Sequence, residues 1–528
     1  MTDAYDAITI GSGLGGLTAA ALYARAGHRV LVLERNDEFG GAATTYRHGR
    51  LRIEASLHET ADFGAPLDPK ARILGALGIL DDLEFVPVGN FYEVRGHMFD
   101  PPFVLPHGFE AAKTALAERF PAHRPAFRRF FQRLRAVQEA MSVVGEQHDS
   151  LWWFLHAPAL PLKLWPLLRD MRLSLSEVFD ELFGDDEVPK LALAANLSYY
   201  GDDPAQLWWV FYALAQGGYL ASGGTYIRGG SGMLSRSLVG VVEAEGGAAR
   251  TGRTVTEIIL DAEGRAAGVA HTAADGGDRV VDHAPVLFGN AAPTVLADAL
   301  PPQARSAFAA RYQGRHPSMS VFSIALGLSR PPRELGFTHY STMLIPQWMN
   351  SLSDYARCAE LLADAPGSRM PVVAIVDYSA IESGLNPDGP HLVSVTGVDR
   401  MANWDGLDDQ AYRAKREGWI DAIVAEIDRS FPGFAAAVVQ REMATAATMR
   451  HYLNTPGGAT YGFAPEPPKG LPTLGSERGV ATTVPGLWLA SAYGGAGGFT
   501  GTMLTGMLAA QAAMKSRHSQ PSVITTGT

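Results

Sequence analysis

Six residues near the N-terminus, Gly11-Ser12-Gly13-Leu14-Gly15-Gly16, have the spacing of a phosphate-binding loop. A short apolar run, 7–10, precedes them and an alanine-rich helical pattern follows. Gly11 permits a tight turn, Gly13 lets the backbone approach a pyrophosphate, and Gly16 lets helix and strand pack closely. The free N–H groups at a helix N-terminus also favour an anion there. The pattern therefore predicts an adenine dinucleotide site.

Glu34 and the residues after it extend this pattern. The acid ends a second apolar run, 30–33, and lies 34 − 16 = 18 residues past the last glycine. A carboxylate at this point of a dinucleotide fold accepts hydrogen bonds from a ribose diol. Arg35 and the pair Gly40-Gly41 follow. The double glycine lets the chain pass close to a second phosphate or to an isoalloxazine ring.

Length and composition narrow the class of protein. At 528 residues the chain is too long for one simple core, so we expect two domains. The net charge of −11 argues against a nucleic-acid surface, and the basic run 124–135 is interpreted as a solvated helix face. The single cysteine, Cys358, excludes an internal disulfide and a thiolate metal cluster, and it suits a cytoplasmic protein.

No secretory signal, membrane span or metal site is expected. Asp3 and Asp6 lead directly into a strand pattern, unlike a signal peptide. Residues 479–514 carry no charge, but Pro485 and several glycines interrupt them, so strand, loop and buried helix are predicted there. The sequence has no HExxH, paired-histidine or clustered-carboxylate pattern, and we therefore expect no bound metal.

The α/β patterns occur in separated blocks, as discontinuous pieces of one sheet would. We expect one nucleotide-binding domain from residues 1–100, 223–300 and 450–515. The intervening residues 101–222, rich in helix patterns, and 301–449, which mix strands with a helix, are predicted to form a second domain. The polar tail 516–528 is expected to be disordered.

Three stretches together resemble the phytoene desaturase superfamily of flavoproteins, which includes carotenoid desaturases, carotenoid cis–trans isomerases and retinol saturases. They are residues 6–41, then GGSGMLSRSL at 229–238, then PGLWLASAYGGAGGFTGTMLTG at 485–506. The run NTPGGATYG at 454–462 is similar to the isomerase and saturase branch. The resemblance implies an α/β fold: a Rossmann-like FAD-binding domain with a mostly parallel sheet, and a second α+β substrate domain. It also implies non-covalent FAD.

The resemblance assigns cofactor contacts by position. The loop residues Gly11, Gly13, Leu14, Gly15 and Gly16 would hold the pyrophosphate, and Glu34 the adenosine ribose, with Arg35, Gly40 and Gly41 beside them. The backbone of Val255 would meet the adenine. The start of the last helix would face the pyrimidine end of the flavin, where its dipole stabilises a reduced, anionic ring; its residues are Gly498, Phe499, Thr500, Gly501 and Met503.

His58 and Glu59 follow the glycine pair by 58 − 41 = 17 residues. The matching segment of the family passes near the flavin, where the desaturases usually carry small or apolar residues and the saturases carry a histidine. An ionisable group there can exchange a proton when hydride and proton transfers are coupled. A purely structural histidine is the alternative. Tyr461 and Tyr493 are weaker candidates for the same role, because buried tyrosines most often only pack.

The activity implied by the resemblance is hydride exchange between FAD and a lipophilic polyene or isoprenoid substrate, as in carotenoid biosynthesis. The direction stays open between desaturation, saturation and redox-neutral isomerisation by reduced FAD. A flavin amine oxidase is an alternative enzyme. A prenyl-protein escort factor of the GDP-dissociation-inhibitor type is an alternative that is not an enzyme.

The apolar stretch 151–168 has two interpretations. Its prolines and its length exclude a continuous membrane helix. It is either a monotopic patch that dips into a bilayer, which would give a cytoplasmic protein peripheral membrane contact, or an ordinary part of the core.

Overall fold

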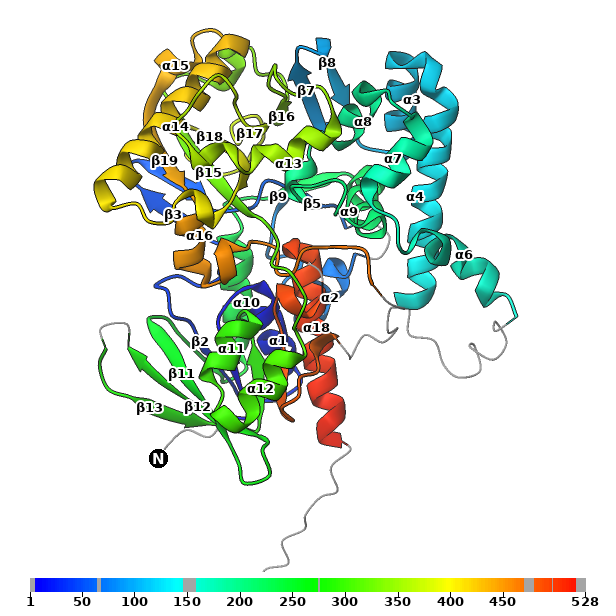
Figure 1. Cartoon of the computed structure of the whole chain (residues 1–528). Coiled ribbons are helices and arrows are strands. Elements are labelled where there is room, and N and C mark those ends of the chain that lie inside the picture. Colours follow the sequence, from blue (N-terminus) through cyan, green and yellow to red (C-terminus); the bar gives the residue numbers. More distant parts are fainter. Residues whose placement is uncertain are drawn as a thin grey trace, which may run out of the picture.

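The computed structural model describes residues 5–63, 68–145, 158–273, 276–469, 479–495 and 497–518. These residues form two parts, drawn one above the other in Figure 1. The lower part is built around a parallel sheet, and the upper part combines a larger mixed sheet with a group of helices. The predicted fold class, a Rossmann-like α/β domain with a second α+β domain, is confirmed.

The parallel sheet joins strands from three distant segments, in the order β10-β2-β1-β14-β20. Their bounds are Ala248–Arg250, Val30–Leu33, Ala7–Ile10, Val286–Gly289 and Leu487–Leu489. Alternate side chains of β1 and β2 enter two different apolar clusters, one on each face of the sheet. Burial on both faces explains why these strands are almost entirely apolar, with Thr9 as the polar residue of β1.

Different layers cover the two faces of this sheet. One face carries α1 (Leu14–Arg25), α10 (Gly232–Ala244) and α18 (Gly498–His518). The other carries an antiparallel sheet and two short helices. These elements are β11 (Arg253–Leu260), β12 (Ala266–Ala273), β13 (Val280–His283), α11 (Pro293–Ala299) and α12 (Pro302–Ala310).

Helices α1 and α18 cross at two glycines. A Cβ atom built on Gly506 would lie 2.2 Å from the carbonyl oxygen of Gly15. A Cβ atom on Gly15 would lie 2.3 Å from the carbonyl oxygen of Ala490, just after β20. Both contacts are with backbone atoms, which cannot rotate away as a side chain can. Glycine therefore sets how closely the first helix approaches both the last strand and the last helix.

The upper part contains a seven-stranded sheet in the order β19-β15-β18-β17-β16-β7-β8. All pairs are antiparallel except β16 with β7. Buried Trp419 and Ile423 of α14 (Asp409–Ser430) belong to the apolar cluster on one face. The strand bounds are Val438–Ala444, Ser320–Leu328, His391–Asp399, Val373–Asp377, Ser341–Leu344, Tyr92–Gly96 and Phe99–Leu105.

The helical side of the upper part is held by one buried carboxylate. Asp170 is fully buried and accepts hydrogen bonds at 2.7 and 3.0 Å from the guanidinium group of Arg133 and at 3.1 Å from the indole of Trp209. Such charge-assisted bonds tie together α4, α6 and α9. The helices are α3 (Phe109–Arg119), α4 (Arg124–Gly145), α6 (Leu160–Asp170), α7 (Leu175–Phe183), α8 (Glu187–Ala194) and α9 (Trp209–Ser222).

Short elements connect the two parts. Strands β3 (Thr45–His48) and β4 (Leu51–Glu54) pair with each other, and β9 (Gly224–Ile227) lies between β5 (Thr60–Ala61) and β6 (Phe85–Pro87). The segment between β4 and β5 carries His58 and Glu59. Among the described residues, the other α-helices are α2 (Lys70–Leu77), α13 (Tyr355–Cys358), α15 (Phe434–Ala437) and α16 (Ala446–Leu453).

The structure corrects the sequence analysis at three points. Strand β7 lies within the predicted nucleotide segment 1–100 but pairs with β16 in the upper sheet, so we propose a boundary before Tyr92. Strand β8 occupies the start of the region expected to be helical; its prolines are tolerated because it lies at the sheet edge. Helix α18 continues through His518 into the expected tail, although its apolar packing ends near Met514 and Ser516 is exposed. Residues 519–528 lie outside the described residues.

The uncharged region 479–514 forms β20 and α18 where the structure describes it, as predicted. Within the described ranges, every helix falls short of the length and apolarity that a bilayer span requires. Residues 151–157 of the apolar stretch lie outside the described residues.

We expect Gly506→Ala to lower the free energy of unfolding by about 1–3 kcal/mol, because the new methyl group collides with the backbone of α1. Urea unfolding followed by circular dichroism measures this change. Gly240→Ala in α10 is the matched control, since a Cβ atom there meets nothing within 4 Å. The control should be neutral or stabilising by up to about 1 kcal/mol. Equal stability of the two variants would contradict the tight crossing.

Candidate functional site

The glycine loop between β1 and α1 closes around Asn290, the residue after β14. Gly11 has φ of +91°, and its Cβ atom would lie 2.7 Å from the carbonyl oxygen of Asn290. Cβ atoms on Gly13 and Gly16 would lie 2.5 and 2.6 Å from the side chain of Asn290. The amide of Asn290 donates a 2.5 Å hydrogen bond to the carbonyl oxygen of Ala490. These glycines therefore place the loop against the ends of two parallel strands.

Ser12 fixes the acid that follows β2. Glu34 is buried and accepts hydrogen bonds from the backbone N–H and the hydroxyl of Ser12, at 2.8 and 2.7 Å. Its other oxygen accepts a 2.9 Å bond from the N–H of Asn36. A carboxylate has about four lone-pair sites, so these three bonds leave room for a ligand hydroxyl. The position of Glu34 at the loop fits its predicted ribose contact, which stays a prediction.

The second glycine pair lies directly on the loop. The N–H of Gly40 donates to the carbonyl oxygen and the hydroxyl of Ser12, both at 3.1 Å. Gly41 has φ of +59°, and its Cβ atom would lie 3.3 Å from the Cα of Gly13. The structure therefore brings together the two glycine motifs. Arg35 points elsewhere: its guanidinium group donates to the carbonyl oxygen of His451.

The start of α1 fits a diphosphate. Its N-cap is Gly13, with no side-chain hydrogen bond to the helix, and its first turn has no acidic residue. The N–H groups of this turn and the helix dipole therefore suit an anion. Val255 lies on β11, beside the acid, because the N–H of Arg253 donates a 2.7 Å bond to the carbonyl oxygen of Glu34. The pyrophosphate contact at α1 and the adenine contact at Val255 stay predictions.

The start of α18 is the predicted flavin end. Gly498 is its first residue and has φ of +75°, and a Cβ atom there would meet nothing within 4 Å. The hydroxyl of Thr500 accepts a 3.0 Å hydrogen bond from the Lys70 ammonium, which also pairs with Asp68. Lys70 is buried, and that burial lowers its pKa. Met503 is fully buried, so its predicted contact with the flavin stays a prediction.

His58 is held as a neutral residue. Burial lowers the pKa of its imidazole to about 4. Nδ1 lies 2.7 Å from the Tyr199 hydroxyl and Nε2 lies 3.4 Å from the Thr396 hydroxyl. Its carbonyl oxygen also accepts a bond from Tyr340. Both ring nitrogens thus have polar neighbours from other parts of the chain, which suits a positioning role better than proton transfer.

Burial shifts the pKa of Glu59 in the opposite direction. Burial raises the pKa of its carboxyl to about 8, so the group is mostly protonated at neutral pH. Among the described residues, its buried Oε2 has no hydrogen-bond partner. Its carboxyl is surrounded by protein, and a Cβ atom built on Gly224 would lie 2.5 Å from Oε2. A neutral carboxyl with a free oxygen atom is able to donate a proton or a hydrogen bond.

Tyr199 and Tyr219 are among the tyrosines that lie near Glu59. Burial and then the nearby Glu59 carboxyl raise the pKa of Tyr199 and Tyr219. Tyr461 lies against the start of α18, since a Cβ atom on Gly497 would be 2.4 Å from its carbonyl oxygen. Burial raises the pKa of Tyr461 to about 12. Tyr493 instead packs edge-on against Phe463 in the core behind the parallel sheet, away from this group.

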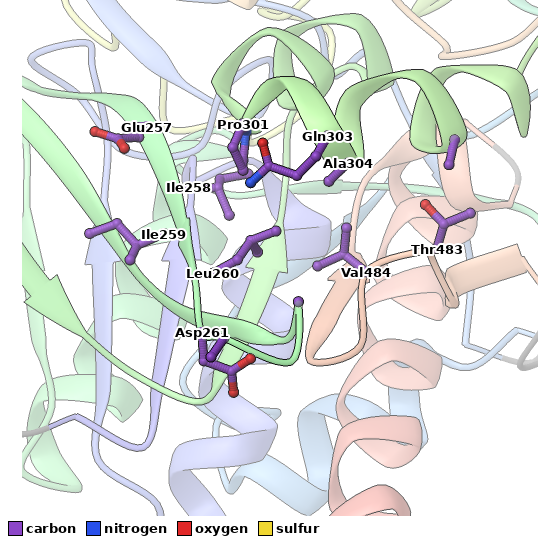
Figure 2. Close-up of a pocket in the computed structure, with 13 residues that line it drawn as sticks. Glu257, Ile258, Ile259, Leu260, Asp261, Pro301, Gln303, Ala304, Thr483 and Val484 are labelled. Carbon is purple, nitrogen blue, oxygen red and sulfur yellow. The ribbon is translucent and has the colours of Figure 1, made fainter.

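A hollow of about 560 Å³ lies at a different place, between β11, α12 and the loop at Val484 (Figure 2). None of the predicted site residues lines it. Glu257 and Asp261 put two carboxylates on its wall, which disfavours a phosphate. In the part of the chain that the structure describes, no group of three histidine, cysteine or acidic side chains is arranged to hold a metal ion.

A family model matches residues 14–514 and is described as flavin-containing amine oxidoreductase. The chain belongs to this family. All-trans-retinol 13,14-reductase from Macaca fascicularis is 25% identical over 97% of this chain and 85% of that protein. Prolycopene isomerase from Daucus carota is 24% identical over 88% and 73%. Cyclohexylamine oxidase from Brevibacterium oxydans has the same fold, with a TM-score of 0.59 at 16% identity, over 97% of this chain and 98% of that one.

The chain is an FAD-dependent oxidoreductase, and its described residues fit that cofactor. The uncapped start of α1 suits a diphosphate, and the open start of α18 suits the electron-rich end of a flavin. The resemblance to flavoproteins that includes retinol saturases and carotenoid isomerases is confirmed by the relatives. The roles given to individual residues stay predictions.

Four residues of this region were missed in the sequence: Ser12, Lys70, Tyr199 and Asn290. Ser12 stands inside the glycine motif, and Asn290 directly follows an apolar strand, so each had a positional signal. Lys70 and Tyr199 had none, because only the fold brings them to Thr500 and His58.

We expect Ser12→Ala to weaken FAD binding by about tenfold, because Glu34 and the N–H of Gly40 each lose their hydrogen bond to the Ser12 hydroxyl while the backbone bonds remain. Titration of the apoprotein with FAD, followed by quenching of flavin fluorescence, measures the affinity. Ser142→Ala is the control, since that exposed hydroxyl only bonds its own helix at Glu139. An unchanged affinity in Ser12→Ala would show that the Ser12–Glu34 bond does not shape the site.

Proposed function

We propose that this chain transfers a hydride between FAD and a carbon–carbon bond of a hydrophobic polyene or isoprenoid, as a retinol saturase or carotenoid desaturase does. The observation that carries the proposal is the apolar, aromatic core of the helical side, which extends to Tyr199, Tyr219 and Tyr461 beside the start of α18. The relatives named for a retinol and a lycopene support the same substrate class.

The residues near the start of α18 and the aromatic core are suited to an uncharged substrate. Glu59 is mostly protonated and His58 is neutral near pH 7, because both are buried. The aromatic core excludes water and aligns a long apolar molecule, while bound FAD supplies the redox chemistry. Glu59, which has a free carboxyl oxygen, is the proposed proton donor or acceptor. His58 holds Tyr199, and Tyr461 forms the wall next to α18.

The proposal includes the setting of the enzyme. A polyene partitions into lipid, so we place the protein in the cytoplasm with peripheral contact to a membrane. The lipophilic substrate would pass from the bilayer to the aromatic core without crossing water.

Anaerobic incubation of the FAD-loaded protein with candidate substrates tests this function. If the enzyme desaturates its substrate, we expect retinol or a carotenoid to bleach the absorbance of the oxidised flavin. If the enzyme saturates its substrate, we expect the same compounds to restore the absorbance of the pre-reduced flavin. A changed cis–trans ratio without net flavin oxidation would identify isomerisation. A flavin response to amines alone would contradict the proposal and identify an amine oxidase.

We expect a proton-transfer role of Glu59 to appear in the pH dependence of turnover. Because the carboxyl titrates at a pKa of about 8, a proton donor would lose activity as the pH rises through that value. Glu59→Gln should lower turnover by about 10²–10⁴-fold and remove this limb of the profile. His58→Gln, which keeps a hydrogen-bonding group beside Tyr199, is the control and should keep it. The same limb in Glu59→Gln would eliminate Glu59 as the titrating group.

A further inference from the structure

Helix α6 presents an apolar face to the outside of the molecule. Leu162, Trp165 and Leu168 are 80, 60 and 49% exposed, although large apolar side chains are usually buried. Their spacing of three residues puts them on one side of the helix, opposite buried Leu167. In Figure 1, α6 lies at the outer edge of the helical side, beyond α4.

The charges beside this face are positive. Lys163, Arg169 and Arg172 are exposed next to the apolar residues. Asp170, the acidic residue of the segment 158–172, is fully buried and paired with Arg133 and Arg169. The exposed surface of the segment is therefore apolar and cationic, whereas the chain as a whole has a net charge of −11. This sign favours an anionic surface as the occupant.

We propose that the face of α6 formed by Leu162, Trp165 and Leu168, with Lys163, Arg169 and Arg172 around it, docks on an anionic phospholipid bilayer. Tryptophan and leucine enter the headgroup boundary while lysine and arginine meet lipid phosphates. A second protein copy fits this face less well, because its cations would face each other across a two-fold contact.

Helix α9 connects the docking face to the candidate site. Helix α6 packs on α9, which carries Tyr219 at its far end. The hydroxyl of Tyr219 donates to the carbonyl oxygen of Glu59 at 3.2 Å. The inference rests on the proposed function for what is extracted from the membrane, but the docking face itself rests on exposure and charge.

Sedimentation of the FAD-loaded protein with phospholipid vesicles tests the docking. We expect binding to vesicles that contain phosphatidylglycerol, and little binding to pure phosphatidylcholine. Leu162→Ser/Trp165→Ser should weaken the binding at least about tenfold, since two large apolar side chains no longer enter the lipid. Lys163→Gln/Arg172→Gln should weaken it by roughly fivefold or more and reduce its salt dependence.

The matched control is Val439→Ser/Tyr452→Ser. These side chains are 56 and 57% exposed but lie on β19 and α16, outside the helical side. The control should bind vesicles like the unaltered protein. Equal loss of binding in the control, or no binding of the unaltered protein, would overturn the proposal.

Other occupants of the face give different results, and each would overturn docking on lipid. If a second copy covers it, the unaltered protein sediments as a dimer in analytical ultracentrifugation and Leu162→Ser/Trp165→Ser as a monomer. If another segment of the same chain covers the face, Leu162→Ser/Trp165→Ser is less stable than the control variant and binds vesicles like the unaltered protein. Turnover of a substrate dissolved in detergent separates the docking proposal from the proposed function. The α6 variants should turn over this substrate like the unaltered protein, because it does not have to be taken from a membrane. If no polyene reacts but the vesicles bind, the proposed function alone fails.

Discussion

The contact between the glycine loop and the carboxyl ends of β14 and β20 determines the architecture of the FAD domain. Asn290 fills the space that side chains on Gly11, Gly13 and Gly16 would need, and it bonds to the backbone at Ala490. Because these positions are glycines, the loop packs directly on Asn290 and leaves its backbone N–H groups free of neighbouring side chains. The parallel sheet is assembled from three segments of the chain, and its strand order places the carboxyl ends of β1, β14 and β20 side by side.

Two neighbouring residues show how burial divides chemical roles. His58 and Glu59 share the same segment, yet burial shifts their pKa values in opposite directions, so that both are mostly uncharged near pH 7. His58 has polar partners on both ring nitrogens and fixes the position of Tyr199. Glu59 keeps a free oxygen atom beside the aromatic core. Burial therefore leaves proton transfer to Glu59, within the proposed function, and a structural role to His58.

The sequence predicted the FAD domain well because its signals are local. The glycines around Gly13, the acid at Glu34 and the start of the last helix at Gly498 each have a fixed distance to a strand or helix pattern. Strand β8 was missed because its prolines resemble a loop, and only the edge position in the sheet makes them acceptable. The approach of Lys70 to Thr500 spans 500 − 70 = 430 positions, so no pattern along the chain could reveal it.

The crossing of α1 and α18 has a consequence for the order of events in the cell. Gly15 and Gly506 touch although they are 506 − 15 = 491 positions apart, and β20 completes the sheet from the same late segment. When only the glycine loop has been synthesised, the last strand and the last helix that pack against it are still missing. With the predicted contacts at the start of α18, we expect stable loading of FAD only after residues near 506 have been made.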